Sequence, residues 1–205
     1  MNNRSALLPL MIILLFVVLQ TFLSPEALNL HKAAIQDGQL ILEGIPLDSQ
    51  ALEISGELPF YKNQLLDPDL RDYSAEDGEL SPFPHAFKEI DDVQYGTYVL
   101  KLSGLEVGQY YGFYLMDALS SYDVYVNGVW LMGNGTVGES KETSIPEANP
   151  TTGIFRADST TATVVFRFSN YTSDLSGIWQ KIVFGTSEAV QAYGEKYSIR
   201  DVFII

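Results

Sequence analysis

The residues best suited to contact a ligand lie in a polar segment, residues 168–179, between two predicted strands. This segment contains Asn170, Tyr171, Asp174 and Trp179. Sugar sites on β-sandwiches combine an aromatic ring face with amide and carboxylate groups that bind hydroxyls, and all three kinds of group are present here. The alternative is that Trp179 fills the edge of the core while Asn170 binds the backbone of its own turn. These four residues are candidate ligand contacts, and both interpretations stay open.

The other residues give little indication of a catalytic site or a metal site. His31 and His85 are the only imidazoles, and no G-x-S-x-G segment presents a nucleophilic serine. The G-x-G-x-x-G pattern at residues 133–138 is not followed by the apolar helix that a dinucleotide site needs. We therefore predict no catalytic residue, no metal ligand and no cofactor. His85, which lies in a predicted loop between Pro84 and Ala86, is added to the candidate ligand contacts.

Charge and cysteine content exclude several classes of protein. Lys and Arg number 12 against 26 Asp and Glu, a formal net charge of −14. A nucleic-acid partner is excluded, because phosphate binding requires a surplus of basic residues. The absence of cysteine excludes a disulfide framework and thiolate metal sites. Nine of the acids crowd into residues 67–92, which we interpret as a solvated loop rather than a calcium site.

Between its two ends, the chain alternates apolar and polar residues with a period of two. This period predicts strands over residues 39–43, 97–102, 110–116, 162–169 and 178–184. The Asn127-Gly128 pair, placed between residues 122–126 and 129–132, predicts a hairpin with a type I′ turn. At least seven short, evenly spaced strands indicate an all-β fold, a jelly-roll-like β-sandwich over residues 38–186.

The two ends of the chain depart from this pattern. Arg4 precedes an uncharged, apolar run, so we predict a signal peptide or membrane-anchor helix over residues 1–23, with a buried core helix as the alternative. Residues 24–37 are predicted to be a linker. Ser187 as N-cap, followed by an acidic residue, predicts a helix over residues 187–205. Its apolar end, residues 202–205, is either a last strand or the start of a truncated membrane segment.

Four blocks in the same order resemble a known family. They are Gly-Glu-Leu-Pro-Phe-Tyr and the residues after it (56–68), Tyr-Gly-Thr-Tyr-Val-Leu (95–100), Tyr-Val-Asn-Gly followed by Asn-Gly-x-Val-Gly (125–138), and Ser-Asn-Tyr with Gly-Ile-Trp and Phe-Gly (169–185). Together they are similar to the extracytoplasmic domain of bacterial seven-transmembrane receptors with diverse intracellular signalling modules. Two positions differ from that family: Leu58 stands where the family usually has Trp, and Pro-His-Ala-Phe (84–87) stands where it commonly has Pro-Gly-x-Trp. The resemblance implies a jelly roll related to galactose-binding domains, and a sensory role.

Two functions follow as hypotheses. The first is an extracytoplasmic sensor of a membrane receptor, without enzymatic activity in these residues, whose ligand is a small molecule or a carbohydrate. Its expected location is the cell membrane, contacted through residues 6–23 and beyond Ile205, with the sandwich outside the cytoplasm. A second copy of the chain is a further candidate partner. The alternative functions are a carbohydrate-binding module of a secreted glycosidase, or a structural exported β-sandwich.

Overall fold

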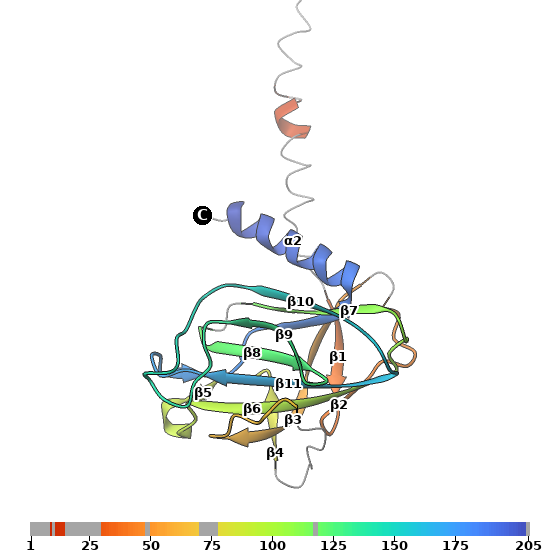
Figure 1. The fold of residues 1–205 in the computed structure, drawn as a ribbon. Helices are drawn as coiled ribbons and strands as arrows, with labels where there is room; N and C mark the ends of the chain where they lie inside the picture. Colours follow the sequence, from red (N-terminus) through yellow and green to blue (C-terminus); the bar gives the residue numbers. More distant parts are fainter. Residues whose placement is uncertain are drawn as a thin grey trace, which may run out of the picture.

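The computed structural model describes residues 9, 11–14, 30–47, 50–69, 78–116 and 119–203. It is built almost entirely of strands (Figure 1), which confirms the all-β prediction. In chain order the elements are β1 (His31–Ile35), β2 (Gln39–Ile41), β3 (Leu52–Lys62), β4 (Glu79–Phe83), β5 (Phe87–Lys88), the 3₁₀ turn η2 (Glu89–Asp91), β6 (Tyr95–Ser103), β7 (Tyr110–Leu115), β8 (Ser121–Val126), β9 (Val129–Asn134), β10 (Thr151–Arg156), β11 (Thr161–Ser169), β12 (Leu175–Ser176), β13 (Ile182–Thr186) and α2 (Ser187–Phe203).

One long strand, β3, joins the two layers of the fold. The main sheet has the order β10-β7-β13-β3-β6-β11-β8-β9. The first residues of β3, Leu52–Ile54, pair with β13, whereas its last residues, 60–62, pair with β6. The sheet curls back on itself, so that β10 at one end of the order contacts β9 at the other (Figure 1). The result is a closed sandwich with one interior.

Several predicted strands agree with the structure because their period of two is satisfied by burial on one face. Tyr98, Leu100 and Leu102 of β6 are buried in the interior. The predicted hairpin is present as β8 and β9, and both turn residues have positive φ, 49° at Asn127 and 84° at Gly128. Positive φ at both central positions is what a type I′ turn requires, so this prediction is confirmed.

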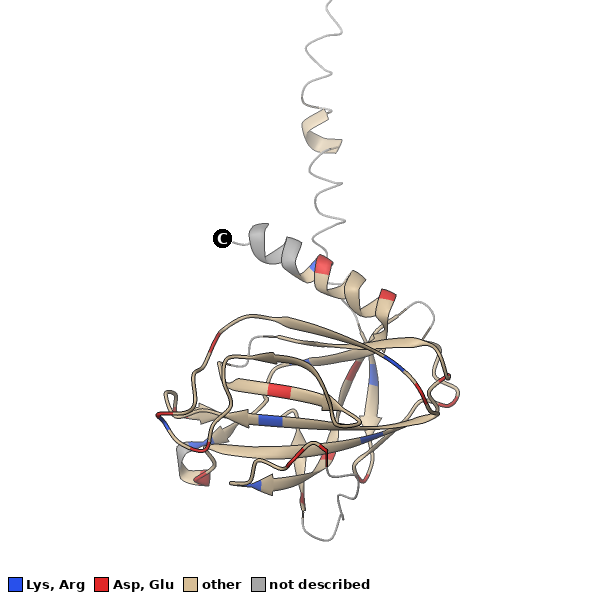
Figure 2. Cartoon of the chain, in the orientation of Figure 1, with Lys and Arg blue, Asp and Glu red and all other residues tan. Residues whose placement is uncertain are grey.

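Two segments predicted to lack strands contain them. Residues 24–37, the predicted linker, include β1, which pairs in parallel with β3. Residues 67–92, the predicted loop, include β4, β5 and η2, and β4 pairs with β3. All three strands are short, and β4 also contains Glu79 and Pro82, so their own sequences do not favour a strand. β1 and β4 form by pairing with the long β3, and β5 forms by pairing with β12. Figure 2 shows acidic positions (red) at both ends of the sandwich and on strands, not in one loop alone.

The interior is dominated by aromatic rings. Phe60 of β3 lies against Phe87 of β5, with ring centroids 4.9 Å apart, and against Tyr98 of β6 at 4.6 Å. Phe168 of β11 completes the group, 6.1 Å from both Phe60 and Tyr98. These four rings, which we call the aromatic stack, connect β3, β5, β6 and β11, of which β5 and β6 alone are close in the sequence.

The predicted C-terminal helix is present as α2, and it packs on the outer face of the sheet. Val190 and Tyr193 are buried against Tyr114 of β7, with the two tyrosine rings 5.4 Å apart. The cap is Thr186 rather than the predicted Ser187, because the Thr186 hydroxyl accepts a hydrogen bond from the Ala189 amide at 3.4 Å. Residues 202 and 203 belong to this helix, so the predicted last strand does not begin there.

Of the predicted N-terminal helix, the structure describes only residue 9 and residues 11–14, which are helical and exposed. The remainder of residues 1–23 lies outside the described residues, as do the last two residues of the chain. Among the helices that the structure does describe, none is both long and apolar enough to cross a membrane.

Gly56 allows β3 to pass close to β1, and its replacement tests this arrangement. A Cβ atom at Gly56 would lie 2.1 Å from the Ile35 carbonyl oxygen, at a φ of +157°. We expect Gly56→Ala to lower the free energy of unfolding by about 3 kcal/mol, because the β1–β3 pairing must separate. Gly44→Ala is the control, because φ is +79° there but no atom of the described residues beyond its chain neighbours lies within 4 Å of the added Cβ. Chemical denaturation of both variants should show a clearly smaller loss for Gly44→Ala, and equal losses would contradict this account of Gly56.

Candidate functional site

Two pockets adjoin each other where β6 begins, at the end of the sandwich that carries β5 and η2. The first, the aromatic pocket, has a volume of about 480 Å³ and lies beside β3, β4 and β5. The second, the loop pocket, has a volume of about 470 Å³ and lies beside residues 170–176. Phe87 and Val93 line both pockets. Both volumes are of the size that small-molecule sites have.

The floor of the aromatic pocket is part of the aromatic stack. Phe60 and Phe87 line it, and their rings are stacked with an interplanar angle of 23°. His85 stands edge-on to Phe87, with centroids 4.8 Å apart and an interplanar angle of 82°. Its backbone amide donates to the Ile178 carbonyl at 2.8 Å, which fixes the loop that carries the imidazole.

The rim of the aromatic pocket is polar. Lys62, Gln64 and Glu79 are exposed and line the pocket. The Lys62 ammonium donates to the backbone carbonyl of Asp91 at 2.8 Å, so the cation is held at the rim above η2. Ring surface below and hydrogen-bonding groups above are the combination that a ligand with both C–H faces and hydroxyls requires.

Asn170, the first predicted contact, organises the loop beside the second pocket. It is 2% exposed. Its amide nitrogen donates to the carbonyls of Leu119 at 3.1 Å and Leu175 at 2.7 Å, and its amide oxygen accepts from the backbone of Thr172 at 2.9 Å and Ser173 at 3.2 Å. Protein groups thus use both sides of the amide, as the alternative interpretation of Asn170 requires, and we do not include it among ligand contacts below.

The other predicted residues are separated by the structure. Tyr171 and Asp174 line the loop pocket together with Asn170, whereas His85 lines the aromatic pocket. Trp179 is half-buried and lines neither of these two pockets. The ligand-contact predictions for Tyr171, Asp174, Trp179 and His85 stay predictions.

The Tyr171 hydroxyl is buried, and among the described residues it has no hydrogen-bond partner. Burial raises the pKa of this hydroxyl, and the nearby charges of Tyr95, Glu139 and Glu142 raise it further. The group is therefore a neutral phenol in the wall of the loop pocket.

Sequence reasoning missed the residues of the aromatic pocket other than His85. Phe60 and Lys62 lie at the end of β3, and Phe87 lies in a segment that was predicted to be a loop. The signal that could have found them is the Phe-Tyr-Lys run after Leu58-Pro59, where two aromatic residues precede a cation at the end of a strand.

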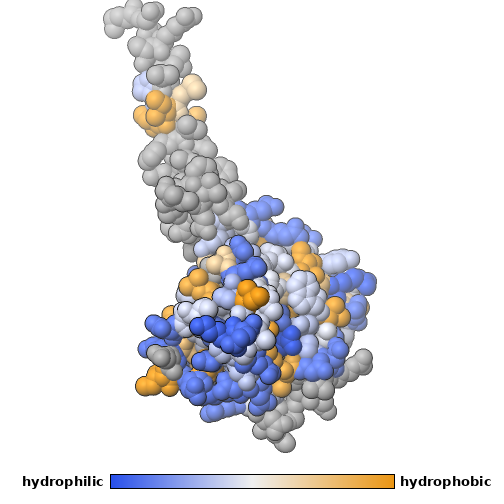
Figure 3. Space-filling view, turned by 60° about the vertical axis from the view of Figure 1, so that its left-hand side comes forward, coloured by the Kyte–Doolittle hydropathy of each residue, from blue (hydrophilic) through white to orange (hydrophobic). Residues whose placement is uncertain are grey.

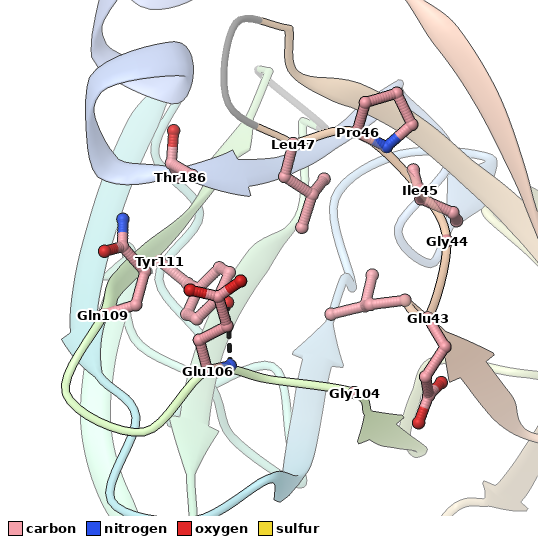
Figure 4. Close-up of a pocket in the computed structure, with 11 residues that line it drawn as sticks. Glu43, Gly44, Ile45, Pro46, Leu47, Gly104, Glu106, Gln109, Tyr111 and Thr186 are labelled. Atoms are coloured by element: carbon pink, nitrogen blue, oxygen red, sulfur yellow. Dashed lines mark hydrogen bonds between the residues drawn. The ribbon is translucent and has the colours of Figure 1, made fainter.

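A third, distal pocket lies at the other end of β6 and has a volume of about 300 Å³. Figure 4 shows Glu43 and Glu106 on its walls, with the Tyr111 hydroxyl accepting a hydrogen bond from the Glu106 amide at 3.0 Å. No group of three or more potential metal ligands occurs among the described residues. The distal pocket lacks the stacked rings of the aromatic pocket, and it serves below as a control.

On the outer face of the sandwich, Arg167 and Asp123 form a structural ion pair. The Arg167 guanidinium donates to both carboxylate oxygens of Asp123, at 2.8 and 2.7 Å, and lies 4.8 Å from the centre of the Tyr125 ring. The Asp123 carboxylate raises the pKa of Arg167 above its usual range. A further bond from Arg167 to the Leu66 carbonyl, at 3.5 Å, ties the segment after β3 to this face.

The structural role of Asn170 leads to a first prediction for this site. Asn170→Ala removes the bonds that hold residues 170–175, so we expect the free energy of unfolding to fall by about 2–3 kcal/mol. Asp174→Ala, an exposed position of the same loop, is the control and should change it by less than about 0.5 kcal/mol. Thermal and denaturant unfolding of both variants measures this. A stable Asn170→Ala variant would show that the amide is free for another task.

The unpartnered hydroxyl leads to a second prediction. Tyr171→Phe removes a buried polar group that has no partner, so we expect stability to stay unchanged or to rise by up to about 1 kcal/mol. The matched control is Tyr122→Phe, because the Tyr122 hydroxyl lies 2.8 Å from the Thr151 hydroxyl and its removal should cost about 1 kcal/mol. Equal destabilisation by both variants, measured by denaturation, would argue against an unsatisfied Tyr171.

Comparison with known proteins identifies the fold. No family model and no curated protein matches the chain. Among solved structures, the Bacteroides uniformis β-glucuronidase is similar with a TM-score of 0.52 and 15% identity over 66% of this chain. A β-glucuronidase from glycoside hydrolase family 2 is similar with a TM-score of 0.51 and 15% identity over 67% of this chain.

A third structure, B. uniformis β-glucuronidase 2 covalently bound to cyclophellitol-6-carboxylate aziridine, is similar with a TM-score of 0.51 and 14% identity over 67% of this chain. This chain spans only 17–18% of the length of the three enzymes. The likeness therefore concerns the fold, and the chain shares the β-sandwich architecture of one part of these large proteins.

Proposed function

We propose that this chain is a non-catalytic β-sandwich domain that binds a polyhydroxylated ligand, such as a carbohydrate, in the aromatic pocket. One observation carries the proposal: the stacked rings of Phe60 and Phe87 lie beneath a rim of hydrogen-bonding side chains. A sugar ring has an apolar face of C–H groups and an edge of hydroxyls. The pocket offers the exposed part of the two rings, each of which is 7% exposed, to the C–H groups, and its polar rim to the hydroxyls.

The chemistry of the rim supports a ligand with many hydroxyl groups rather than one with a single charge. Lys62 and His85 donate, Glu79 accepts, and Gln64 does both. The Lys62 ammonium and the carboxylates of Glu79 and Asp91 all lie at this pocket, so charges of both signs are available. A hydroxyl can donate to one of these groups and accept from another, which is how a sugar is oriented.

Two kinds of host protein are compatible with such a domain. The first is a membrane receptor in which this domain senses an extracytoplasmic ligand, as the resemblance of the four sequence blocks implies. The second is a glycoside hydrolase in which it is an accessory domain, a host favoured by the fold likeness to glycosidases of which the chain spans a small part. Reading the gene beyond the codon for Ile205 distinguishes them, since a receptor continues into apolar membrane helices and a hydrolase into a catalytic domain.

Binding by the full chain, purified in a mild detergent, tests the proposed function. The probes are glucose, N-acetylglucosamine and galacturonate, with the linear hexamer of each, measured by calorimetry. We expect at least one probe to bind, and we expect His85→Ala and Lys62→Met to weaken it about tenfold, because each removes a rim donor.

Glu43→Gln, in the distal pocket, is the control and should bind the same probe as the unmodified chain does. Each variant should unfold at the same temperature as the unmodified chain, so that lost binding is not lost folding. The proposal fails if no probe binds, or if Glu43→Gln weakens binding as much as His85→Ala does.

A further inference from the structure

The two adjoining pockets are separated by a single narrow ridge. The ridge consists of β5 and η2, residues 87–91, with the aromatic pocket on one side and the loop pocket on the other. Because Phe87 and Val93 line both pockets, the two cavities adjoin each other at the ridge.

The ridge is held in place by bonds from both sides. On the side of the aromatic pocket, Lys62 donates to the Asp91 carbonyl at 2.8 Å. On the side of the loop pocket, β12 pairs with β5, and the Ser176 hydroxyl donates to the Val93 carbonyl. Within the ridge, the Asp91 carboxylate accepts from the Lys88 amide at 2.8 Å. Two fixed cavities at a fixed separation form a preorganised surface, which reduces the ordering cost of a long ligand.

The top of the ridge is apolar. Ile90, in the middle of η2, is 89% exposed. Ile90 lines neither pocket itself, but it belongs to the segment 87–91, in which Lys88 lines the loop pocket and Asp91 lines the aromatic pocket. A ligand that occupies both pockets must cross the ridge, and in doing so it covers the Ile90 side chain and removes apolar surface from water.

The loop pocket repeats the chemistry of the aromatic pocket's rim. Its exposed lining includes the hydroxyls of Thr172 and Ser173, the carboxylates of Asp92 and Asp174, and the Lys88 ammonium. As in the aromatic pocket, hydrogen-bond donors and acceptors are mixed, and basic and acidic side chains are both present. This arrangement suits a ligand with hydroxyl groups, which donate and accept. Figure 3 shows hydrophilic and apolar residues mixed over one face of the molecule, with no single extended apolar patch there.

We infer that the aromatic pocket and the loop pocket are two subsites of one groove, and that the ligand is an oligosaccharide rather than a single sugar. This inference rests on the proposed function. One sugar unit stacks over Phe60 and Phe87 beside His85, a later unit binds Asp174 and its neighbours, and the intervening part of the chain crosses Ile90.

The experiment compares a monosaccharide with its linear hexamer on the full chain, using the same probes as above. For the sugar that binds, we expect the hexamer to bind at least about tenfold more tightly than the monomer, because only the hexamer fills both subsites. Ile90→Ala and Asp174→Ala should weaken the hexamer about fivefold and leave the monomer unchanged, whereas His85→Ala should weaken both.

Val107→Ala is the matched control for Ile90→Ala, because Val107 is also apolar and exposed but follows β6 at the distal end. It should change neither affinity. If monomer and hexamer bind equally, or if Ile90→Ala and Asp174→Ala leave the hexamer unaffected, the two-subsite groove is wrong while the proposed function stands. If no sugar binds at all, the proposed function itself is wrong.

Discussion

The aromatic stack is the interaction on which the rest of the structure depends. Phe60, Phe87, Tyr98 and Phe168 come from β3, β5, β6 and β11, of which β5 and β6 alone follow one another in the sequence. Their contacts hold a two-residue strand, β5, against the sandwich, although within the described part of the chain β5 has only β12 as a ladder partner. A two-residue strand forms few ladder hydrogen bonds, so the burial of Phe87 is what keeps β5 in place.

The same rings form the floor of the aromatic pocket, so folding and the candidate site cannot be separated there. A pocket whose floor is core has a fixed shape, and a ligand that stacks on it meets rings already held in place. The Phe60 ring packs directly against the backbone at Gly96, where a Cβ atom would lie 2.5 Å from the ring. For this reason the variants chosen to test binding lie on the rim and on the ridge rather than on the floor.

Other contacts hold the outside of the sandwich. On one outer face, Arg167, which is paired with Asp123, also donates to the Leu66 carbonyl in the segment after β3. The Thr97 hydroxyl donates to the Gln64 carbonyl of the same segment at 2.7 Å. On the other outer face, α2 covers β7 and β13 through Val190 and Tyr193. Both faces of the sheet are thus covered in part, and residues such as Val99 and Val165 are buried although they point away from the interior. The β5 end, by contrast, keeps two open pockets, and this is why the candidate site lies there.

The sequence by itself determined the all-β class, the β8–β9 hairpin and the C-terminal helix. Each of these depends on neighbours in the chain: a period of two, an Asn127-Gly128 turn, or a capped helical run. The strands β1, β4 and β5 are established only by the tertiary structure. They are too short to show a period in the sequence, and they form by pairing with distant partners. The tertiary structure likewise placed Tyr171 and Asp174 at one pocket, His85 at the other and Trp179 at neither. It also showed that the Asn170 amide is bonded to backbone groups of its own loop and of Leu119. Long-range packing decides which side chains share a cavity, so the spacing of residues along the sequence does not predict it.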